Sequence, residues 1–432
     1  MKSIVSTKVV VMDPGLIAPG GHHTGFAYMA AQSRSDRELP IELEFVCSHC
    51  VDVVIKEKIE EFGCRVRPEF FINFYELFAN DDGSAESQTY IRQASREYYE
   101  AICNTEKPAE GQALIFFHPC VSWEHAVSLS LALRLHDGQE HALHIICAMF
   151  NPGIRHNGKT LSQSSKMQFG MAFRALEKNR NARVFASDFE LAEKYARLLD
   201  RQVLLDIHPC YLADWEKIAQ EKRKLQYSNK PSKTRILLYF GDAKVDKGFT
   251  SLPELVRNIL ADCESPIELN IHFNNPWDAV DLQEVTAELK DIAAIDDRLN
   301  LIEKFLSDDD LHLILHESDL ILLNYDSSIY MEKSSGVLWL AAYHSLPVCI
   351  LQNSWLRREA FRLGVQTVDF KDLNSFIEET VSMCGMKQRN EATDAQLQYR
   401  KTIYQPFWSW LFKVGKSDNS GKNIGTHHVE LF

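Results

Sequence analysis

The sequence predicts an α/β protein built from two doubly wound, Rossmann-like domains. Short, continuously apolar segments rich in β-branched residues alternate with longer segments that have helical periodicity. Parallel strands buried on both faces have such apolar runs, and strands that alternate with helices form βαβ units. The alternation breaks once, in a polar and lysine-rich segment, and then starts again, which indicates a second domain.

The first half has strands and helices in regular alternation. The strands are expected at residues 9–11, 41–46, 113–117, 143–147 and 183–186. The helices are expected at residues 90–103, 125–135, 165–176 and 189–199. Ser187 and Asp188 precede the last of these helices, where short polar side chains cap the free amides of the first turn.

The second half repeats the pattern. Its strands are expected at residues 235–240, 267–273, 300–302, 320–323 and 347–351. Its helices are expected at residues 252–260, 282–292, 308–316, 336–344 and 370–381. Asp308, Asp309 and Asp310 lie in the first turn of one of them, where carboxylates suit the helix dipole.

These patterns divide the chain into five parts. We expect an N-terminal domain at 1–210, a linker at 211–233, a C-terminal domain at 234–395, returning helices at 396–413 and a mobile tail at 414–432. The aromatic segment 399–412 is expected to pack against the N-terminal domain. Its basic flanks leave peripheral contact with a membrane surface as the alternative.

Composition excludes several classes of protein. Of the 432 residues, 45 % are hydrophobic and 25 % charged, which is typical of a globular protein and not of a disordered or coiled-coil chain. The net charge of −13 disfavours a nucleic-acid partner. No apolar run is long enough to span a bilayer, and the first residues do not resemble a signal peptide, so we expect a cytoplasmic protein.

Cysteine usage gives little support for a metal centre. Most of the ten cysteines lie in apolar runs, which indicates buried, reduced thiols. Cys47 and Cys50 form one C-x-x-C pair with His49 between them. A structural zinc site requires a second pair at matching spacing, and the sequence has none, so no metal is expected.

The first strand is followed by a glycine-containing turn, D-P-G-L-I-A-P-G-G-H-H-T-G. Its glycines do not have the G-x-G-x-x-G spacing, which disfavours a Rossmann dehydrogenase. Gly20 and Gly21 still provide unhindered backbone at the carboxyl end of a strand, where open α/β sheets bind ligands; a plain strand-to-helix turn is the alternative. His22 and His23 begin the next helix, and either face a ligand or are solvated.

The second half contains three features typical of an anion site. The segment GDAKVDKG begins at Gly241 and Asp242 and ends at Lys247 and Gly248, so that a glycine permits close approach and a lysine reaches a phosphate. Tyr325 and Tyr330 follow a buried strand and could stack on a base or close a pocket. Lys333, Ser334, Ser335 and Gly336 open a helix, where free amides and hydroxyls attract anions; ordinary N-capping by serine is the alternative.

The order of these motifs resembles the donor-binding half of GT-B fold glycosyltransferases. The similarity is strongest over residues 234–350, with GDAKVDKG followed by SDLILLNYDSSIYMEKSSGVLWLAAYHSLPVCI. It is closest to the bacterial retaining superfamily that carries the E-x7-E motif. The resemblance implies two Rossmann-like domains that face a cleft, with a nucleotide-diphosphate sugar as donor.

Roles for individual residues follow from the resemblance. The donor would be held by Gly241, Asp242, Lys247, Gly248, Tyr325, Tyr330, Lys333, Ser334, Ser335 and Gly336. The acceptor would lie against Gly20, Gly21, His22 and His23. His118, at the end of a buried strand, would face the donor sugar, with a loop histidine of no role as the alternative. Glu332 stands at the first glutamate of the family motif.

The sequence departs from the family pattern at three positions. Leu340 replaces the second glutamate of E-x7-E, and a leucine cannot hydrogen-bond a ribose. Ser345 replaces the glycine of G-x-P-V, and Asn324 replaces the proline of the P-Y pair.

The implied activity is transfer of a hexosyl group, with retention of configuration, to a glycan, lipid-linked or protein acceptor. No cofactor or metal is implied beyond the sugar nucleotide, and the oligomeric state is left open. A nucleotide-sugar epimerase of the same fold is one alternative. A non-catalytic binding protein is the other, and Leu340 motivates it.

Overall fold

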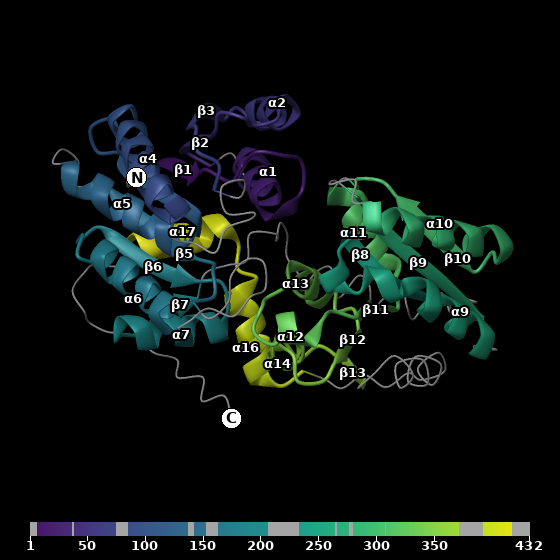
Figure 1. Ribbon diagram of the computed structural model, residues 1–432. Coiled ribbons are helices and arrows are strands. Elements are labelled where there is room, and N and C mark those ends of the chain that lie inside the picture. Colours follow the sequence, from purple (N-terminus) through teal and green to yellow (C-terminus); the bar gives the residue numbers. More distant parts are fainter. Residues whose placement is uncertain are drawn as a thin grey trace. The chain divides into compact units, whose positions relative to one another are not determined.

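The structure is a computed structural model that describes residues 7–36, 39–74, 85–136, 142–152, 163–205, 233–263, 266–275, 280–306, 308–370 and 392–416. The chain divides into two compact units (Figure 1). Unit 1 is Met1–Leu212 with Gln405–Glu430, and unit 2 is Ala213–Tyr404 with Leu431–Phe432. The expected linker at 211–233 and the expected helix at 370–381 lie almost wholly outside the described residues.

Unit 1 is built on a seven-stranded parallel sheet with the order β3-β2-β1-β4-β5-β6-β7. Its strands are β1 (Thr7–Asp13), β2 (Ile41–Ser48), β3 (Arg65–Phe70), β4 (Ala113–Val121), β5 (Leu143–Ala148), β6 (Ala182–Ala186) and β7 (Leu204–Leu205). In the central register Val9 lies beside Leu43 of β2 and Ile115 of β4. These apolar strands are buried on both faces, as the continuous hydrophobic runs predict.

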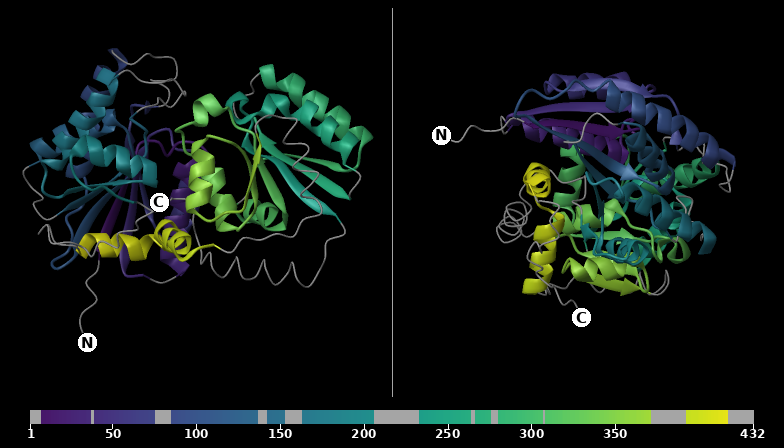
Figure 2. Two further views of the ribbon diagram at one scale, coloured as in Figure 1. Left: turned by 90° about the horizontal axis from the view of Figure 1, so that it is seen from below. Right: turned by 90° about the vertical axis from the view of Figure 1, so that its left-hand side faces the viewer.

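Helices cover both faces of this sheet. One face packs against α4 (Ala85–Cys103), α5 (Trp123–Leu135), α6 (Gln163–Glu177) and α7 (Phe189–Leu199). The other face packs against α1 (Gly21–Asp36), α2 (Val53–Glu61) and α17 (Phe407–Lys416). In α17, drawn in yellow in Figure 2, Phe407 and Trp410 are 2 % exposed and contact Phe117 of β4. These aromatic side chains therefore belong to the core of unit 1 and are not free to rest on a membrane.

Unit 2 has a six-stranded parallel sheet with the order β10-β9-β8-β11-β12-β13. Its strands are β8 (Thr234–Asp242), β9 (Ile267–Asn274), β10 (Leu299–Glu303), β11 (Leu320–Leu323), β12 (Val348–Leu351) and β13 (Thr367–Phe370). Its helices are α9 (Leu252–Asp262), α10 (Val280–Ile295), α11 (Asp308–Glu317), α12 (Ser327–Tyr330), α13 (Gly336–Tyr343), α14 (Trp355–Arg362) and α16 (Asp394–Ile403), with the 3-10 turns η1 (Val245–Lys247) and η2 (Phe249–Ser251). Two doubly wound parallel sheets confirm the predicted fold class.

The sequence predicts each central strand but not the edge strands β3, β7 and β13. β3 reads RVRPEF, and its charges and Pro68 obscure an apolar run. Proline lacks a backbone donor and is tolerated at a sheet edge, which is where β3 lies.

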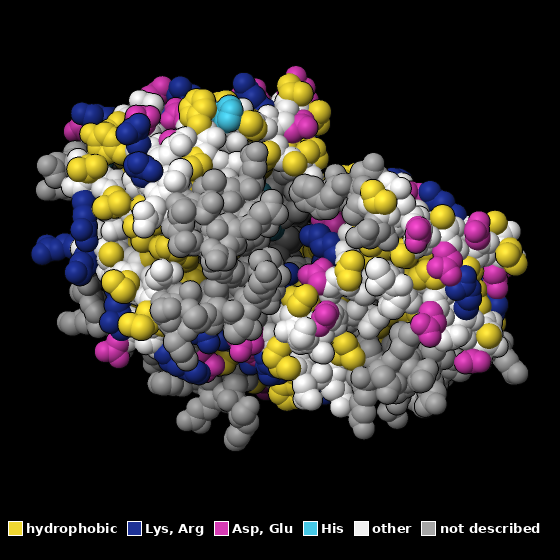
Figure 3. Space-filling model, viewed as in Figure 1, with side chains coloured by type: hydrophobic (Ala, Val, Ile, Leu, Met, Phe, Trp, Pro, Cys, Tyr) yellow, Lys and Arg dark blue, Asp and Glu magenta, His cyan; other side chains and the backbone are white. Residues whose placement is uncertain are grey.

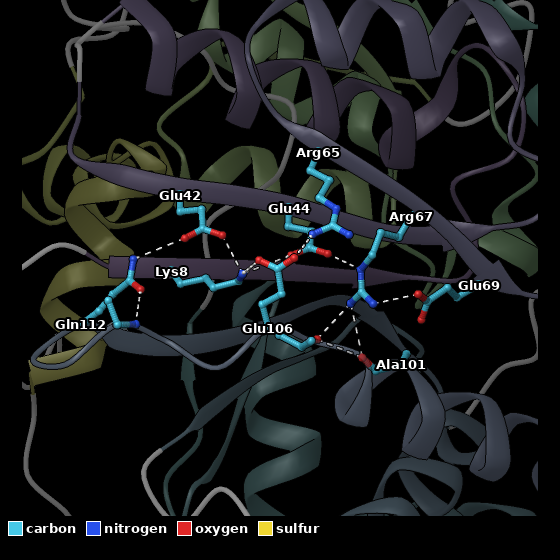
Figure 4. Close-up of polar contacts among 11 residues, drawn as sticks. Lys8, Glu42, Glu44, Arg65, Arg67, Glu69, Ala101, Glu106 and Gln112 are labelled. Carbon is cyan, nitrogen blue, oxygen red and sulfur yellow. Dashed lines mark hydrogen bonds and ion pairs between the residues drawn. The ribbon is translucent and has the colours of Figure 1, made fainter.

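A buried ionic network crosses the first three strands of unit 1 (Figure 4). Lys8 of β1 and Glu44 of β2 have side chains that are only 2 % exposed, and Lys8 Nζ lies 3.6 Å from Glu44 Oε2. Arg67 of β3 pairs with Glu44 from the other side. Arg67 also donates to the carbonyl of Ala101 in the last turn of α4, where a cation suits the helix dipole.

The surface is mixed in character. On the face drawn in Figure 3, apolar, acidic and basic side chains are interspersed over both units. Among the described residues, no helix is long and apolar enough to cross a membrane.

Candidate functional site

Each sheet has one position where the strand order reverses. In unit 1 this position lies between β1 and β4, and in unit 2 between β8 and β11. The connections that leave these neighbouring strands run to opposite faces of the sheet and leave a crevice at the carboxyl ends, where open α/β sheets bind ligands. Most of the residues singled out in the sequence lie at these two positions, so each unit contains its own candidate half-site.

The half-site of unit 1 is organised by Asp13, the last residue of β1. Its carboxylate accepts the backbone N–H of Gly15 at 3.0 Å and lies 2.8 Å from Nδ1 of His23. Asp13 is 3 % exposed. A Cβ on Gly15 would come within 2.3 Å of the His23 ring, so glycine is required there for the ring to pack over the turn. Asp13 therefore fixes His23 with its Nε2 directed away from the carboxylate.

Gly20 and Gly21 form the turn that leads into α1. Their φ angles of 89° and 72° lie in the left-handed region, which favours glycine. His22 and His23 follow in the first turn of α1, with ring centroids 4.1 Å apart. The structure thus brings the four predicted acceptor-side residues together, and it adds Asp13 and Gly15 to them.

His118 lies elsewhere. Its side chain is fully buried on the face of the sheet covered by α4, where Tyr98 is a neighbour. Its Nε2 lies 3.2 Å from Nδ1 of His144, and the two rings stack. Burial holds the pKa of His118 well below its usual range, and the charges of His144 and His125 act in the same direction. His118 is therefore a neutral core residue with no surface that a ligand could contact in this arrangement.

The half-site of unit 2 centres on Lys247, in the turn that follows β8. A Cβ on Gly241, whose φ is 111°, would lie 3.7 Å from the Lys247 ammonium. Lys244 pairs with Asp242 at 3.7 Å, and Lys333 pairs with Asp246 at 3.2 Å. Lys247 has no such ion pair among the described residues. Burial lowers its pKa, and the nearby charges of Asp242 and Asp246 oppose that shift. It is a lysine held beside open backbone that forms no ion pair with a described carboxylate.

Gly248 lets the two loops of this half-site meet. Its φ is 79°, and a Cβ there would lie 2.1 Å from the carbonyl oxygen of Asn324 at the end of β11. The side chain of Asn324 also donates to Ser251 at 2.9 Å. The loops after β8 and β11 are therefore in contact through the Asn324 backbone as well as through its side chain.

We expect Gly248→Ala to destabilise unit 2 by about 2–3 kcal/mol, because it adds backbone strain and a clash with a carbonyl. Gly111→Ala is the matched control, since Gly111 also has a φ of 79° but has open space around it. Urea unfolding of both variants measures the difference. Equal losses of unfolding free energy would show that the contact with Asn324 is not tight.

Two tyrosines line the same edge. Tyr325 and Tyr330 are 4 % and 2 % exposed, and their ring centroids are 4.5 Å apart. The Ser335 hydroxyl donates to the Tyr325 oxygen at 3.5 Å. Burial raises the pKa of both phenols, so they stay protonated. The two phenols can therefore donate hydrogen bonds and offer apolar ring surface, but they do not act as general bases.

Asp246 joins the two loops and was not singled out in the sequence. Its backbone carbonyl accepts the N–H of Asp326, and its carboxylate pairs with Lys333, whose ammonium lies 5.0 Å above the Tyr330 ring. Tyr239, also missed, holds the β8 turn because its hydroxyl accepts the N–H of Lys244. These contacts join residues far apart in the chain, and no local spacing reveals them.

The helix α13 begins without a side-chain cap. Ser335 is the N-cap residue, but its side chain makes no capping hydrogen bond, so simple serine capping does not describe this helix. Ser334 and Gly336 flank it and are partly exposed, and Glu332 is exposed on the preceding turn. The orphan amides of a helix start attract anions. Leu340, 8 % exposed, packs inside the unit on the same helix.

Comparison with solved structures identifies the fold of this chain. No protein-family model and no curated protein sequence matches the chain. It is similar to an Escherichia coli trehalose-6-phosphate structure bound with UDP-2-fluoro glucose, at 9 % identity over 95 % of this chain and 100 % of the other, with a TM-score of 0.58. The chain has the GT-B fold.

Two further solved structures agree. Anabaena HepE in complex with UDP and glucose is 13 % identical over 95 % of this chain and 100 % of the other, with a TM-score of 0.53. A Listeria monocytogenes protein, provisionally described as a UDP-N-acetylglucosamine 2-epimerase, is 14 % identical over 98 % of this chain and 100 % of the other, with a TM-score of 0.52. The similarity spans both units, and at these identities it establishes architecture alone.

Proposed function

We propose that this protein is a nucleotide-sugar-dependent glycosyltransferase whose unit 2 binds the donor. The observation that carries the proposal is the half-site at the end of β8 and β11. There, the Lys247 ammonium has no described ion pair, lies beside Gly241, and is accompanied by an uncapped helix start at Ser335 and Gly336. A lysine and free amides are the groups that bind a diphosphate.

The proposed chemistry is departure of a nucleoside diphosphate from the sugar. Negative charge develops on the diphosphate oxygens in the transition state. Lys247 and the amides of α13 supply preorganised positive charge for it. Ser334 and Ser335 add hydroxyl donors, and Asp242, Gly248 and Lys333 shape the loops around them. Tyr325 and Tyr330 provide apolar surface for the nucleotide or sugar.

Unit 1 supplies the acceptor side in this proposal, through Gly20, Gly21, His22 and His23. His118 takes no part, because its ring is fully buried. Glu332 stays as a candidate catalytic carboxylate, since it is exposed and directly precedes Lys333. Retention of configuration rests on the resemblance of the motifs. The structures of similar fold that contain UDP or a UDP-sugar support a donor of that class.

Nucleotide titration tests the donor site. Isothermal titration of UDP-, GDP-, ADP- and CMP-sugars is expected to identify one nucleotide. Lys247→Ala is expected to weaken its binding about 10–100-fold, because a charge-assisted hydrogen bond contributes about 1.5–3 kcal/mol. Lys244→Ala is the matched control, since Lys244 lies three positions away and already pairs with Asp242. Binding that is unaffected by Lys247→Ala would remove the basis of the proposal.

The same nucleotide sugar then separates the alternatives. A transferase releases the nucleoside diphosphate in proportion to acceptor. An epimerase, the activity suggested by the similar fold of the Listeria protein, converts the sugar nucleotide with no acceptor present, which NMR of the sugar detects. Absence of binding to any nucleotide would favour the non-catalytic protein that Leu340 suggests.

A further inference from the structure

A second cluster of chemistry-bearing side chains lies at the strand reversal of unit 1. The imidazoles of His22 and His23 and the thiol of Cys120 each offer one ligand atom, and these atoms all lie within 4.8 Å of one another. The histidines come from the first turn of α1, and the cysteine from the end of β4. Two segments that are far apart in the sequence thus contribute side chains to one cluster of potential metal ligands.

Cys120 lies in an irregular stretch of β4. The register of β4 with β5 shifts between His118 and Val121, which is a bulge that re-aims the intervening side chains. The thiol of Cys120 is unoxidised, and the residue is 9 % exposed.

His23 is already oriented as a ligand. Its Nδ1 contacts the carboxylate of Asp13, at 2.8 Å from one oxygen and 3.0 Å from the other. In the tautomer that donates its Nδ1 proton to Asp13, Nε2 is the nitrogen that would bind a metal. Histidines that bind metals commonly donate their other ring N–H to a carboxylate, which fixes the ring and raises its basicity. Gly15 leaves the space in which the ring makes this contact.

Two other histidine–cysteine contacts show what distinguishes this cluster. Cys50 Sγ lies 3.3 Å from Nε2 of His49, and Cys103 Sγ lies 3.6 Å from Nδ1 of His136. Both cysteines are exposed. Within the part of the chain that the structure describes, neither pair has a third ligand that completes a group, whereas Cys120 has two histidines.

The spacing suits a tetrahedral ion. With metal–nitrogen bonds of about 2.0–2.1 Å and a metal–sulfur bond of about 2.3 Å, ligand atoms around zinc stand about 3.3–3.6 Å apart. The three ligand atoms lie within 4.8 Å of one another, so the side chains reach this spacing by moving together by at most about 1.5 Å. Imidazole and thiolate are the ligands that zinc prefers.

We propose that His22, His23 and Cys120 bind a zinc ion, with Asp13 as the carboxylate that positions His23. Three protein ligands leave the fourth position of the ion open for an oxygen ligand. If the proposed glycosyl transfer holds, that oxygen is a hydroxyl of the acceptor, which is the part of the inference that rests on the proposed function. The metal site itself does not depend on it. The absence of a second C-x-x-C pair in the sequence does not bear on this site, because its ligands come from distant positions.

Cobalt titration of the full-length protein tests the site. The chain is stripped of metal with a chelator, kept reduced, and titrated with Co²⁺, which gives a near-ultraviolet charge-transfer band when bound by a thiolate. One equivalent of Co²⁺ is expected to bind, and Zn²⁺ is expected to displace it. Cys120→Ala is expected to abolish the band, and His22→Ala and His23→Ala are expected to weaken binding at least tenfold. Asp13→Asn is expected to weaken it about 10–100-fold.

Cys50→Ala and Cys103→Ala are the controls, because they remove a cysteine that lies beside one histidine. The inference is overturned if the band is absent, if it survives Cys120→Ala, or if either control removes it. Cys120→Ser preserves the size of the side chain and is used as the control for folding. If its urea midpoint matches that of the parent protein, loss of the cobalt band in this variant is not caused by loss of the fold.

The experiment also separates this inference from the proposed function. Cobalt titration needs no nucleotide, and nucleotide titration can be done on the metal-stripped chain. Nucleotide binding without cobalt binding would overturn the metal site alone. Cobalt binding without nucleotide binding would overturn the donor site and leave the metal site standing.

Discussion

Lowering the pH from 7 to 5 is expected to destabilise unit 1 by about 6 kcal/mol, through three buried histidines. His118, His125 and His144 are 0 %, 4 % and 4 % exposed. Burial lowers the pKa of His125 and of His144 to about 3, and it holds that of His118 well below its usual range. All three are neutral in the folded protein at pH 5.

The direction of the effect follows from the unfolded chain, in which a histidine has a pKa of about 6.5. Below that value the unfolded chain takes up protons that the folded chain does not, so protonation favours unfolding. The stability is therefore fully present above about pH 6.5 and is lost as the pH falls towards the depressed pKa of the folded state. Between pH 7 and pH 5 each histidine accounts for about 2 kcal/mol. A loss of this size brings a domain of ordinary stability close to unfolding.

Urea unfolding at the two pH values, followed by hydrogen exchange in peptides from β4 and β5, measures this effect in unit 1. His144→Phe is expected to remove about a third of the pH dependence, since its ring stacks on Phe116 and a phenyl ring can preserve that contact. His49→Gln is the control, because His49 is exposed. Equal stability at pH 7 and pH 5 would mean that the folded histidines take up protons after all.

The sequence predicts most of the fold because its central strands are local signals. Val9, Val10 and Val11 form a continuous apolar run, and the structure buries all of them at 0 % exposure. The edge strand β3 carries Pro68 and alternating charges, so it lacks that signal. Strands with two covered faces are thus readable from composition, whereas an edge strand depends on its single neighbour.

The site is only partly readable in the same way. Lys247 and Ser335 were singled out because glycine, lysine and serine recur beside strand ends, and the structure gathers them at one sheet edge. Asp13 and Asp246 were missed, because their roles depend on His23 and Lys333, and such pairings appear only after folding. His118 follows a strand as an active-site histidine would, but the pattern does not show which face of the sheet receives the side chain.

Glu44→Ala is expected to destabilise unit 1 by about 3–5 kcal/mol, because it removes the buried carboxylate that Lys8 and Arg67 share and leaves them the more exposed Glu42 and Glu69. Glu44 pairs with both Lys8 and Arg67, and the side chains of Glu44 and Lys8 are 2 % exposed. Two cations that share one buried anion repel each other once it is removed, and water cannot replace it. Urea unfolding of unit 1 measures the loss.

Two comparisons show whether burial causes this effect. Glu42 also pairs with Lys8, at 2.6 Å, but its side chain is 49 % exposed, so Glu42→Ala is expected to cost less than about 1 kcal/mol. In the triple variant Lys8→Met, Glu44→Leu, Arg67→Met, no charge is left unpaired at these positions, and such apolar replacements are often neutral or stabilising. The triple variant is therefore expected to be more stable than Glu44→Ala alone. If Glu44→Ala lowers the free energy of unfolding by no more than Glu42→Ala does, then water reaches Lys8 and Arg67. This ionic network would then be solvated and not buried.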